Sequence, residues 1–222
     1  VEKENLLPTT ESLYHMTEPQ WMAEHLQDDL ALQLFAFKEG RCRDLDQDRT
    51  NKLAAKLDFK FDWNNTATLR TQAGQLLDRY SLRATRFILD KARAFASQNN
   101  KKLLVVLFDP GRTMAELKQS GTRYDQEIVD YLTAEKVNYF DMNEVHIRDF
   151  RRYNLSFEEY KKQYLIGHYN PAGNHFFAHS IKGKVVDWLD PKPITYQQRD
   201  PQTIEFKDYL QGQSLKPATA RP

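Results

Sequence analysis

The spacing of apolar residues predicts helices over residues 20–37, 69–98 and 124–136, and from Pro171 onward. In each segment, apolar side chains recur every three or four residues, as they do on the buried face of a helix. For residues 69–98 we expect an inner face made of Leu76, Tyr80, Ala84, Phe87, Ile88 and Phe95. The segment after Pro171 repeats the pattern with Phe177, Ile181, Val185 and Trp188.

Two short segments do not follow helical spacing, and we predict both to be strands. Residues 103–108 form an unbroken apolar run that ends at Asp109, as expected of a strand buried on both faces of a parallel sheet. We predict a second, shorter strand over residues 137–141. The order helix, strand, helix, strand, helix is typical of β-α-β crossovers. We therefore predict an α/β protein with a three-layer α/β/α arrangement, in which residues 103–108 are an interior parallel strand.

The composition changes after Leu189, where proline and glutamine become frequent. We predict a single α/β domain over residues 1–189 and an extended tail over residues 190–222. The tail should pack loosely and tolerate truncation. The chain begins at Val1 rather than at a methionine, from which we expect that an upstream segment has been removed. This expectation favours a secreted or periplasmic protein, although the localisation stays open.

Charge and cysteine content narrow the classes of partner. The chain of 222 residues has 32 basic and 31 acidic side chains, so no basic field predicts nucleic-acid binding. No apolar run is long enough to cross a membrane. Cys42 is the only cysteine, which leaves no disulfide framework and no cysteine metal site.

The most informative segment runs from Gly167 to His175 and places His168 directly before a predicted helix. Asn170 is a suitable N-cap, and Pro171 fits the first helical position. The field of the helix N-terminus favours the neutral form of the nearby imidazole. A neutral, fixed imidazole is what a general base requires. The alternative is that His168 only caps or hydrogen-bonds its loop.

Other polar residues follow the predicted strands. Asp109 and Asp141 stand at strand ends, where α/β proteins place their chemistry, but each could simply cap a helix. Residues 142–164 form a long polar and aromatic connection that carries His146, Asp149, Tyr153 and Tyr160. Long connections of this kind are often functional.

We expect no metal site and no cofactor. His175 and His179 have the i, i+4 spacing of a zinc-binding pair, but Phe176 stands where a zincin has its glutamate. His15, His25 and Cys42 lie in no ligand spacing and near no strand end. We expect none of these three to bind metal or to act in catalysis.

The order of elements and the block His168-x-Asn170-x-x-Gly173-Asn174 resemble the C-terminal half of an SGNH/GDSL-type hydrolase. The resemblance covers about residues 81–189. It implies a flavodoxin-like parallel sheet and a serine esterase or acyltransferase. It also implies that His168 is the general base, and that the substrate is a small-molecule or carbohydrate ester.

The chain departs from that family at three blocks. The Gly-Asp-Ser block that supplies the nucleophile is not found, and none of Ser12, Ser81, Ser97 and Ser120 follows a strand within such a block. The asparagine-bearing oxyanion block also has no clear match. Leu165 and Ile166 replace the acid that normally precedes the histidine. Asp141 or Glu144 could supply that acid. Asn170 and Asn174 would support the loop by capping and by side-chain hydrogen bonds.

Three interpretations therefore remain open. The chain is the C-terminal part of an enzyme whose nucleophile lies upstream of Val1. Alternatively, it is an inactive relative that binds a ligand such as a glycan. In the third interpretation the resemblance is accidental, and the chain is a helix-rich α/β binding protein.

Overall fold

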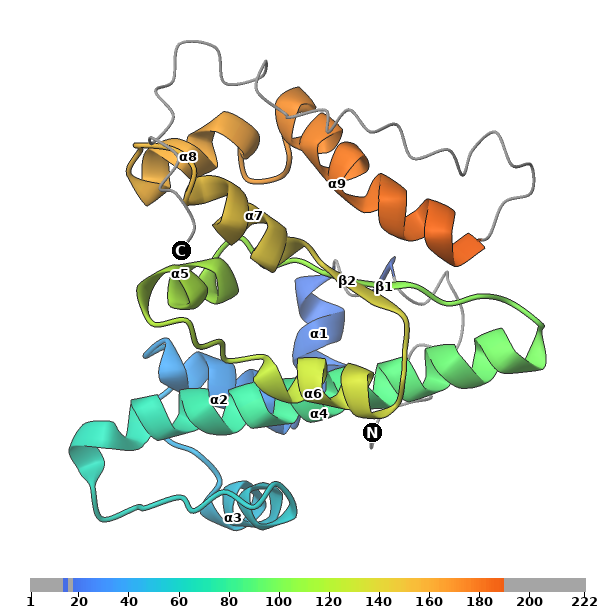
Figure 1. Cartoon of the computed structure of the whole chain (residues 1–222). Coiled ribbons are helices and arrows are strands. Elements are labelled where there is room, and N and C mark those ends of the chain that lie inside the picture. Colours follow the sequence, from blue (N-terminus) through green and yellow to red (C-terminus); the bar gives the residue numbers. More distant parts are fainter. Residues whose placement is uncertain (1–13, 16–17, 190–222) are drawn as a thin grey trace. The chain divides into compact units, whose positions relative to one another are not determined.

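The computed structural model describes residues 14–15 and 18–189 and is mostly helical, with 65% helix and 5% strand. Its contacts divide the chain into an N-terminal unit, residues 1–99, and a C-terminal unit, residues 100–222 (Figure 1). Each unit is described by itself. The single domain expected over residues 1–189 stays a prediction, and the expectations for the tail lie outside the described residues.

Helices make up the described part of the N-terminal unit. They are α1 (Pro19–Leu26), α2 (Leu30–Lys38), α3 (Gln47–Lys56) and α4 (Leu69–Gln98), with a 3-10 turn at Thr66–Thr68 before α4. The helix predicted over residues 20–37 is divided at Asp29, whose side chain accepts from the Leu32 N–H at 3.1 Å and so caps α2. Asp46 caps α3 in the same way, through the Arg49 N–H at 3.0 Å.

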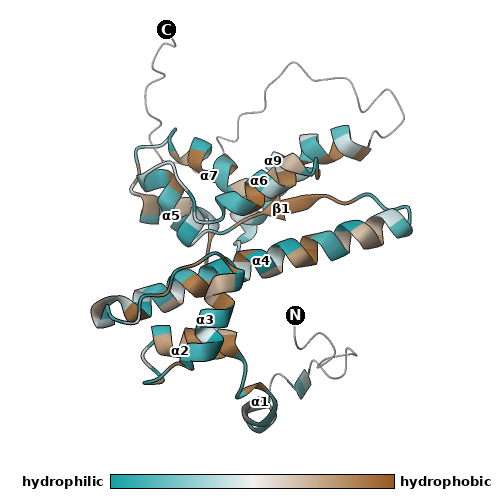
Figure 2. Ribbon diagram, turned by 90° about the horizontal axis from the view of Figure 1, so that it is seen from below, coloured by the Kyte–Doolittle hydropathy of each residue, from teal (hydrophilic) through white to brown (hydrophobic). Residues whose placement is uncertain are grey.

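An apolar core joins α2, α3 and the first half of α4. Its buried members are Leu34, Phe37, Ala54, Phe61, Ala73 and Leu76. The predicted inner face of residues 69–98 is correct at Leu76, which is fully buried. It is wrong in the second half of α4, where Phe87, Ile88 and Phe95 are 37%, 64% and 64% exposed. Apolar positions continue along α4 in Figure 2 because helical spacing alone does not show where the packing partner ends.

The C-terminal unit contains a β-α-β crossover followed by three helices. The crossover consists of β1 (Val105–Leu107), α5 (Arg112–Gln119), α6 (Gln126–Ala134) and β2 (Tyr139–Asp141). The helices that follow are α7 (Met142–Phe150), α8 (Phe157–Tyr164) and α9 (Pro171–Leu189). The two strands are parallel, with Val105 opposite Tyr139 and Leu107 opposite Asp141.

The predicted three-layer α/β/α fold is wrong. The described residues form one sheet of two strands, and β1 pairs only with β2 in it. Val106, in the middle of β1, is 38% exposed, so β1 is not an interior strand. An unbroken apolar run correctly indicated a parallel strand, but it cannot show how many neighbours that strand has.

The connection expected over residues 142–164 is instead mainly the helices α7 and α8. Asp141 caps α7, and Ser156 begins α8 with a capping box to Glu159. α7 buries histidine and aspartate, and α8 buries two tyrosines, so hydropathy alone did not reveal their helical period. The spacing of His146 and Asp149, and of Tyr160 and Tyr164, is nevertheless that of a helix face.

Candidate functional site

The loop that carries His168 is a short connection between α8 and α9 that is closed by backbone hydrogen bonds. Leu165 and Tyr169 form an antiparallel bridge, and the Ile166 N–H donates to the His168 carbonyl at 2.7 Å. Gly167 lies between them with φ +90°, a backbone conformation that side chains with a Cβ rarely adopt. The loop backbone is therefore held in one shape by its own hydrogen bonds.

The start of α9 is built as the sequence predicted. The Asn170 Oδ1 accepts from the Gly173 N–H at 2.8 Å, and its Nδ2 donates to the Gln163 carbonyl at 2.9 Å. A Cβ at Gly173 would lie 2.2 Å from the Tyr164 carbonyl oxygen and 2.4 Å from the Tyr169 ring, so only glycine fits there. Asn174 is exposed, and its N–H donates to the Asn170 carbonyl. A role for its side chain stays a prediction.

His168 is exposed, and its ring is oriented by the backbone. Its Nδ1 lies 2.8 Å from the carbonyl oxygen of Tyr169. A carbonyl can only accept, so Nδ1 carries the proton and, in the neutral ring, Nε2 is the unprotonated nitrogen. Within the part of the chain that the structure describes, no carboxylate or hydroxyl hydrogen-bonds to this ring.

Tyr169 anchors the loop at the carboxyl end of β1. Its ring stacks on Phe108, the residue after β1, with centroids 4.7 Å apart. Its hydroxyl lies 2.8 Å from Nε2 of His146. Because β1 and β2 are parallel, their carboxyl ends share one edge, and His168 is adjacent to the residue that packs there.

Behind the loop lies a buried polar cluster to which the sequence analysis gave no specific role. His146 is fully buried, with Nδ1 lying 3.1 Å from the Tyr160 hydroxyl. Tyr160 and Tyr164 donate to Asp149 Oδ2 at 3.0 and 3.1 Å. Burial lowers the pKa of His146 to about 4, so its ring is neutral near pH 7.

Burial also shifts the pKa values of the other titratable groups in the cluster. It raises the pKa of Asp149, against the opposing effect of the two tyrosine hydroxyls. It also raises the pKa values of Tyr160, Tyr164 and Tyr169. The tyrosines therefore act as neutral hydrogen-bonding groups.

The candidate acids at the strand ends have structural partners. Asp141 Oδ1 caps α7 through the Asn143 N–H at 3.0 Å, and Asp141 Oδ2 pairs with the buried Arg123. Glu144 lies in the first turn of α7. No hydrogen bond joins either carboxylate to His168 among the described residues, so an orienting role for them stays a prediction.

Asp109 is also a helix cap. Its carboxylate accepts from the Gly111 and Thr113 N–H groups at 2.9 and 3.0 Å. Burial works to raise the pKa of this carboxyl, but these hydrogen bonds outweigh burial and hold the pKa below its usual value. The Asp109 N–H donates to Asn143 Oδ1 at 2.7 Å, which links the end of β1 to the start of α7.

The remaining candidate ligands are scattered. His15 and His25 each stack on Trp21, and the Cys42 thiol lies 3.7 Å from the Gln33 carbonyl oxygen. His175 and His179 line a surface hollow on α9 together with Ala178 and Lys182. Within the described residues, no group of three or more histidine, cysteine or acidic side chains could hold a metal ion.

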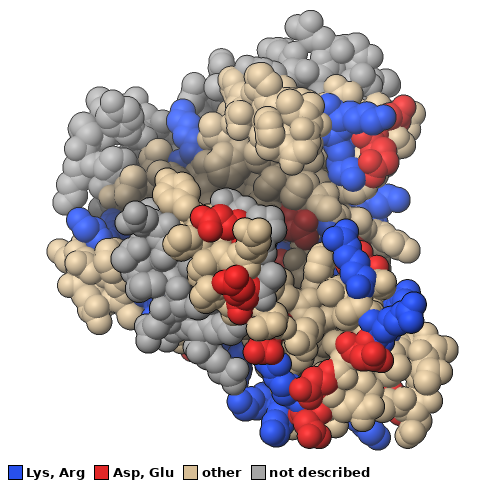
Figure 3. Space-filling model, turned by 180° about the vertical axis from the view of Figure 1, so that it is seen from behind, with Lys and Arg blue, Asp and Glu red and all other residues tan. Residues whose placement is uncertain are grey.

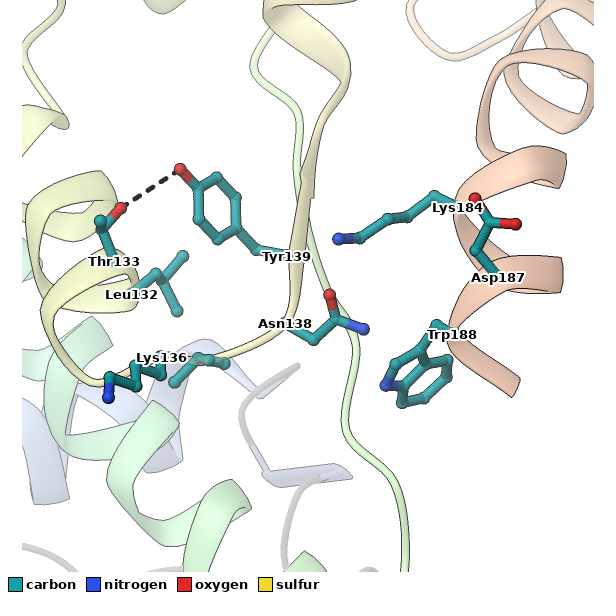
Figure 4. A pocket seen from close by; sticks show the side chains of 9 residues that line it. Leu132, Thr133, Lys136, Asn138, Tyr139, Lys184, Asp187 and Trp188 are labelled. Carbon is teal, nitrogen blue, oxygen red and sulfur yellow. Dashed lines mark hydrogen bonds between the residues drawn. The ribbon is translucent and has the colours of Figure 1, made fainter. Parts of the chain in front are cut away.

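A separate groove lies between α6, the start of β2 and the end of α9 (Figure 4). It has a volume of about 620 Å³, and Figure 4 shows Asn138, Lys184 and Trp188 around it. Tyr139 turns toward α6, where its hydroxyl lies 3.3 Å from that of Thr133. The groove is at the amino end of β2, the opposite end from His168.

Basic and acidic side chains lie next to one another among the coloured residues in Figure 3. No helix of the described residues is both long enough and apolar enough to cross a membrane. Comparison of the chain with protein-family models, with curated proteins and with solved structures finds no match in any of the three.

Proposed function

We propose that the chain contributes the general base of an ester hydrolase or acyltransferase of the SGNH/GDSL type, with His168 as that base. The observation that carries the proposal is the bond from His168 Nδ1–H to the Tyr169 carbonyl, in a ring that is exposed. This bond leaves Nε2 as the nitrogen that can accept a proton. Such a nitrogen takes the proton from a hydroxyl as its oxygen attacks an ester carbonyl.

The proposal places the nucleophile outside the described residues. Ser81, Ser120 and Ser180 hydrogen-bond to carbonyls of their own helices, and Ser156 caps α8. We therefore keep the expectation that the nucleophile lies on a segment upstream of Val1. The Tyr169 carbonyl fixes the tautomer as an acid would, but it lacks the full charge that stabilises imidazolium. The reaction should therefore be slow.

The test compares this chain with the product of its whole open reading frame, using p-nitrophenyl acetate. This chain should hydrolyse the ester no faster than its His168→Ala variant. In the longer product, His168→Ala should lower the rate by about 10²–10⁴-fold, the usual contribution of a general base. His175→Ala removes another exposed imidazole and serves as the control.

Two results would count against the esterase. One is an open reading frame with no Gly-Asp-Ser block. The other is full ester hydrolysis by the His168→Ala form of the longer protein. Both would favour the alternative of a catalytically inactive relative that binds a ligand.

The groove of Figure 4 supports that alternative. An indole beside amide, ammonium and carboxylate groups, here Trp188, Asn138, Lys184 and Asp187, combines an apolar face with polar contacts, as sugar sites do. The probe is a set of soluble oligosaccharides, with binding measured by titration calorimetry. Trp188→Ala should abolish a binding signal that Trp63→Ala leaves in place. Equal binding by both variants would exclude the groove as the site.

A further inference from the structure

The hydrogen bonds of the buried cluster can run in only one direction. Each tyrosine hydroxyl has one proton, and that of Tyr160 is donated to Asp149. Its oxygen must therefore accept from Nδ1–H of His146. The neutral ring is then unprotonated at Nε2, which accepts from the Tyr169 hydroxyl at 2.8 Å. Asp149 thus fixes the direction of a chain that ends at Tyr169.

Tyr169 joins this chain to the proposed base. Its hydroxyl is the last donor of the buried cluster, and its carbonyl accepts from His168. The ring between them is held by Phe108, stacked at 4.7 Å, and by the close approach of Gly173. Holding the ring fixes the direction of the carbonyl, because the residue lies in a bridge that restricts its backbone.

We infer that His146 is a positioning residue, which acts through Tyr169 to hold His168 in the Nδ1–H tautomer with Nε2 turned outward. The inference deepens the proposed function and rests on it for its catalytic meaning. Among the described residues, no hydrogen bond or ring contact joins His146 to His168 directly. Its effect passes through the hydroxyl, the ring and the carbonyl of one residue. A merely structural cluster would stabilise the fold without selecting a tautomer of His168.

The test reads the tautomer of His168 directly, by nitrogen-15 NMR of the labelled chain under conditions where the spectrum shows the neutral ring. Tyr169→Phe removes only the hydroxyl that bonds to His146. We expect the ratio of the Nδ1–H form to the Nε2–H form to fall about tenfold, the factor that one hydrogen bond of ordinary net strength is worth. His146→Gln should give a fall of similar size.

Tyr164→Phe is the matched control. It removes another buried hydroxyl bonded to Asp149, but one outside the link from His146 to Tyr169. It should lower stability and leave the His168 tautomer unchanged. The inference is overturned if Tyr169→Phe keeps the original ratio, or if Tyr164→Phe changes it equally. The measurement needs no ester and no nucleophile, so its outcome is separate from that of the esterase assay.

Discussion

The two units of the chain are stabilised by different kinds of core. In the N-terminal unit, α2, α3 and α4 share a core dominated by leucine, phenylalanine and alanine. In the C-terminal unit, methionines and aromatic rings surround a buried His146, Asn143 and Asp149. The energy of apolar contacts depends little on the orientation of the groups, whereas that of hydrogen bonds depends on it strongly. The difference indicates that the first core supports helix packing, while the second also holds a surface loop in one geometry.

From this difference we predict that the largest loss of stability comes from removing side-chain volume in the N-terminal core. Leu76 is fully buried, so Leu76→Ala should lower the free energy of unfolding by about 4 kcal/mol. Amide hydrogen exchange in residues 18–99 would measure it. Ile88→Ala, on the exposed part of the same helix, should cost less than about 1 kcal/mol. Similar losses at both positions would contradict the described core.

The C-terminal core should instead respond to pH. The pKa of His146 is about 4 in the fold and about 6.5 in an unfolded chain, so protons favour the unfolded state between these values. Its contribution is complete above about pH 6.5 and is lost as the pH falls through 4, a change of about 3 kcal/mol. The raised pKa of Asp149 has the opposite effect, because protonation of this carboxyl favours the folded state.

The contribution of His146 to this pH dependence is the difference in unfolding free energy between the original chain and His146→Gln. The difference between the two should shrink toward pH 4. Arg152 approaches Asp149 at 3.8 Å and keeps its charge throughout this range. Asp149→Asn removes the opposing carboxyl, so the fall with acid should become steeper. Parallel pH profiles for the original chain and His146→Gln would show that His146 is not the group that titrates.

The sequence predicted local features of the C-terminal unit better than its tertiary ones. Asn170 as the cap of α9 and the strands around Val106 and Phe140 could be found, because capping chemistry and apolar runs are local signals. The number of strands could not be found, since it depends on pairing between distant segments. His146 was named from the sequence as part of a long connection of a kind that is often functional, but its hydrogen bonds were not predicted. Their partners are 14 and 23 residues away and meet it only after α7, α8 and the His168 loop have packed.

A third prediction concerns the close packing of the His168 loop. Gly173→Ala places a Cβ against the Tyr164 carbonyl and the Tyr169 ring, so we expect a loss of about 2–3 kcal/mol from overpacking. Thermal unfolding of the chain measures the loss. Gly183→Ala is the matched variant on the same helix, because nothing lies within 4 Å of its Cβ position. It should stabilise by up to about 1 kcal/mol through helix propensity. A neutral Gly173→Ala would mean that the loop is looser than described.

The smallest predicted effect separates the hydrogen bonds of the second core from its packing. Tyr160→Phe keeps the ring but removes the hydroxyl that joins His146 to Asp149. We expect a loss of about 2 kcal/mol, because a buried donor and a buried acceptor lose their partner. Tyr153→Phe is the control, because the Tyr153 ring is also buried, at 3% exposed, whereas its hydroxyl makes no hydrogen bond within the described residues.

The Tyr153→Phe change should stay within about 0.5 kcal/mol of the original chain. Chemical denaturation of the two variants side by side measures the contrast at constant ring volume. If both variants lose the same free energy of unfolding, the hydrogen bonds of Tyr160 contribute nothing specific to the stability of this core. The two cores would then differ only in composition. If only Tyr160→Phe is destabilised, the bonds that run from Asp149 to Tyr169 are a specific part of the fold. Whether those bonds also orient His168 is decided by the tautomer measurement, because a loss of stability alone does not report the state of that ring.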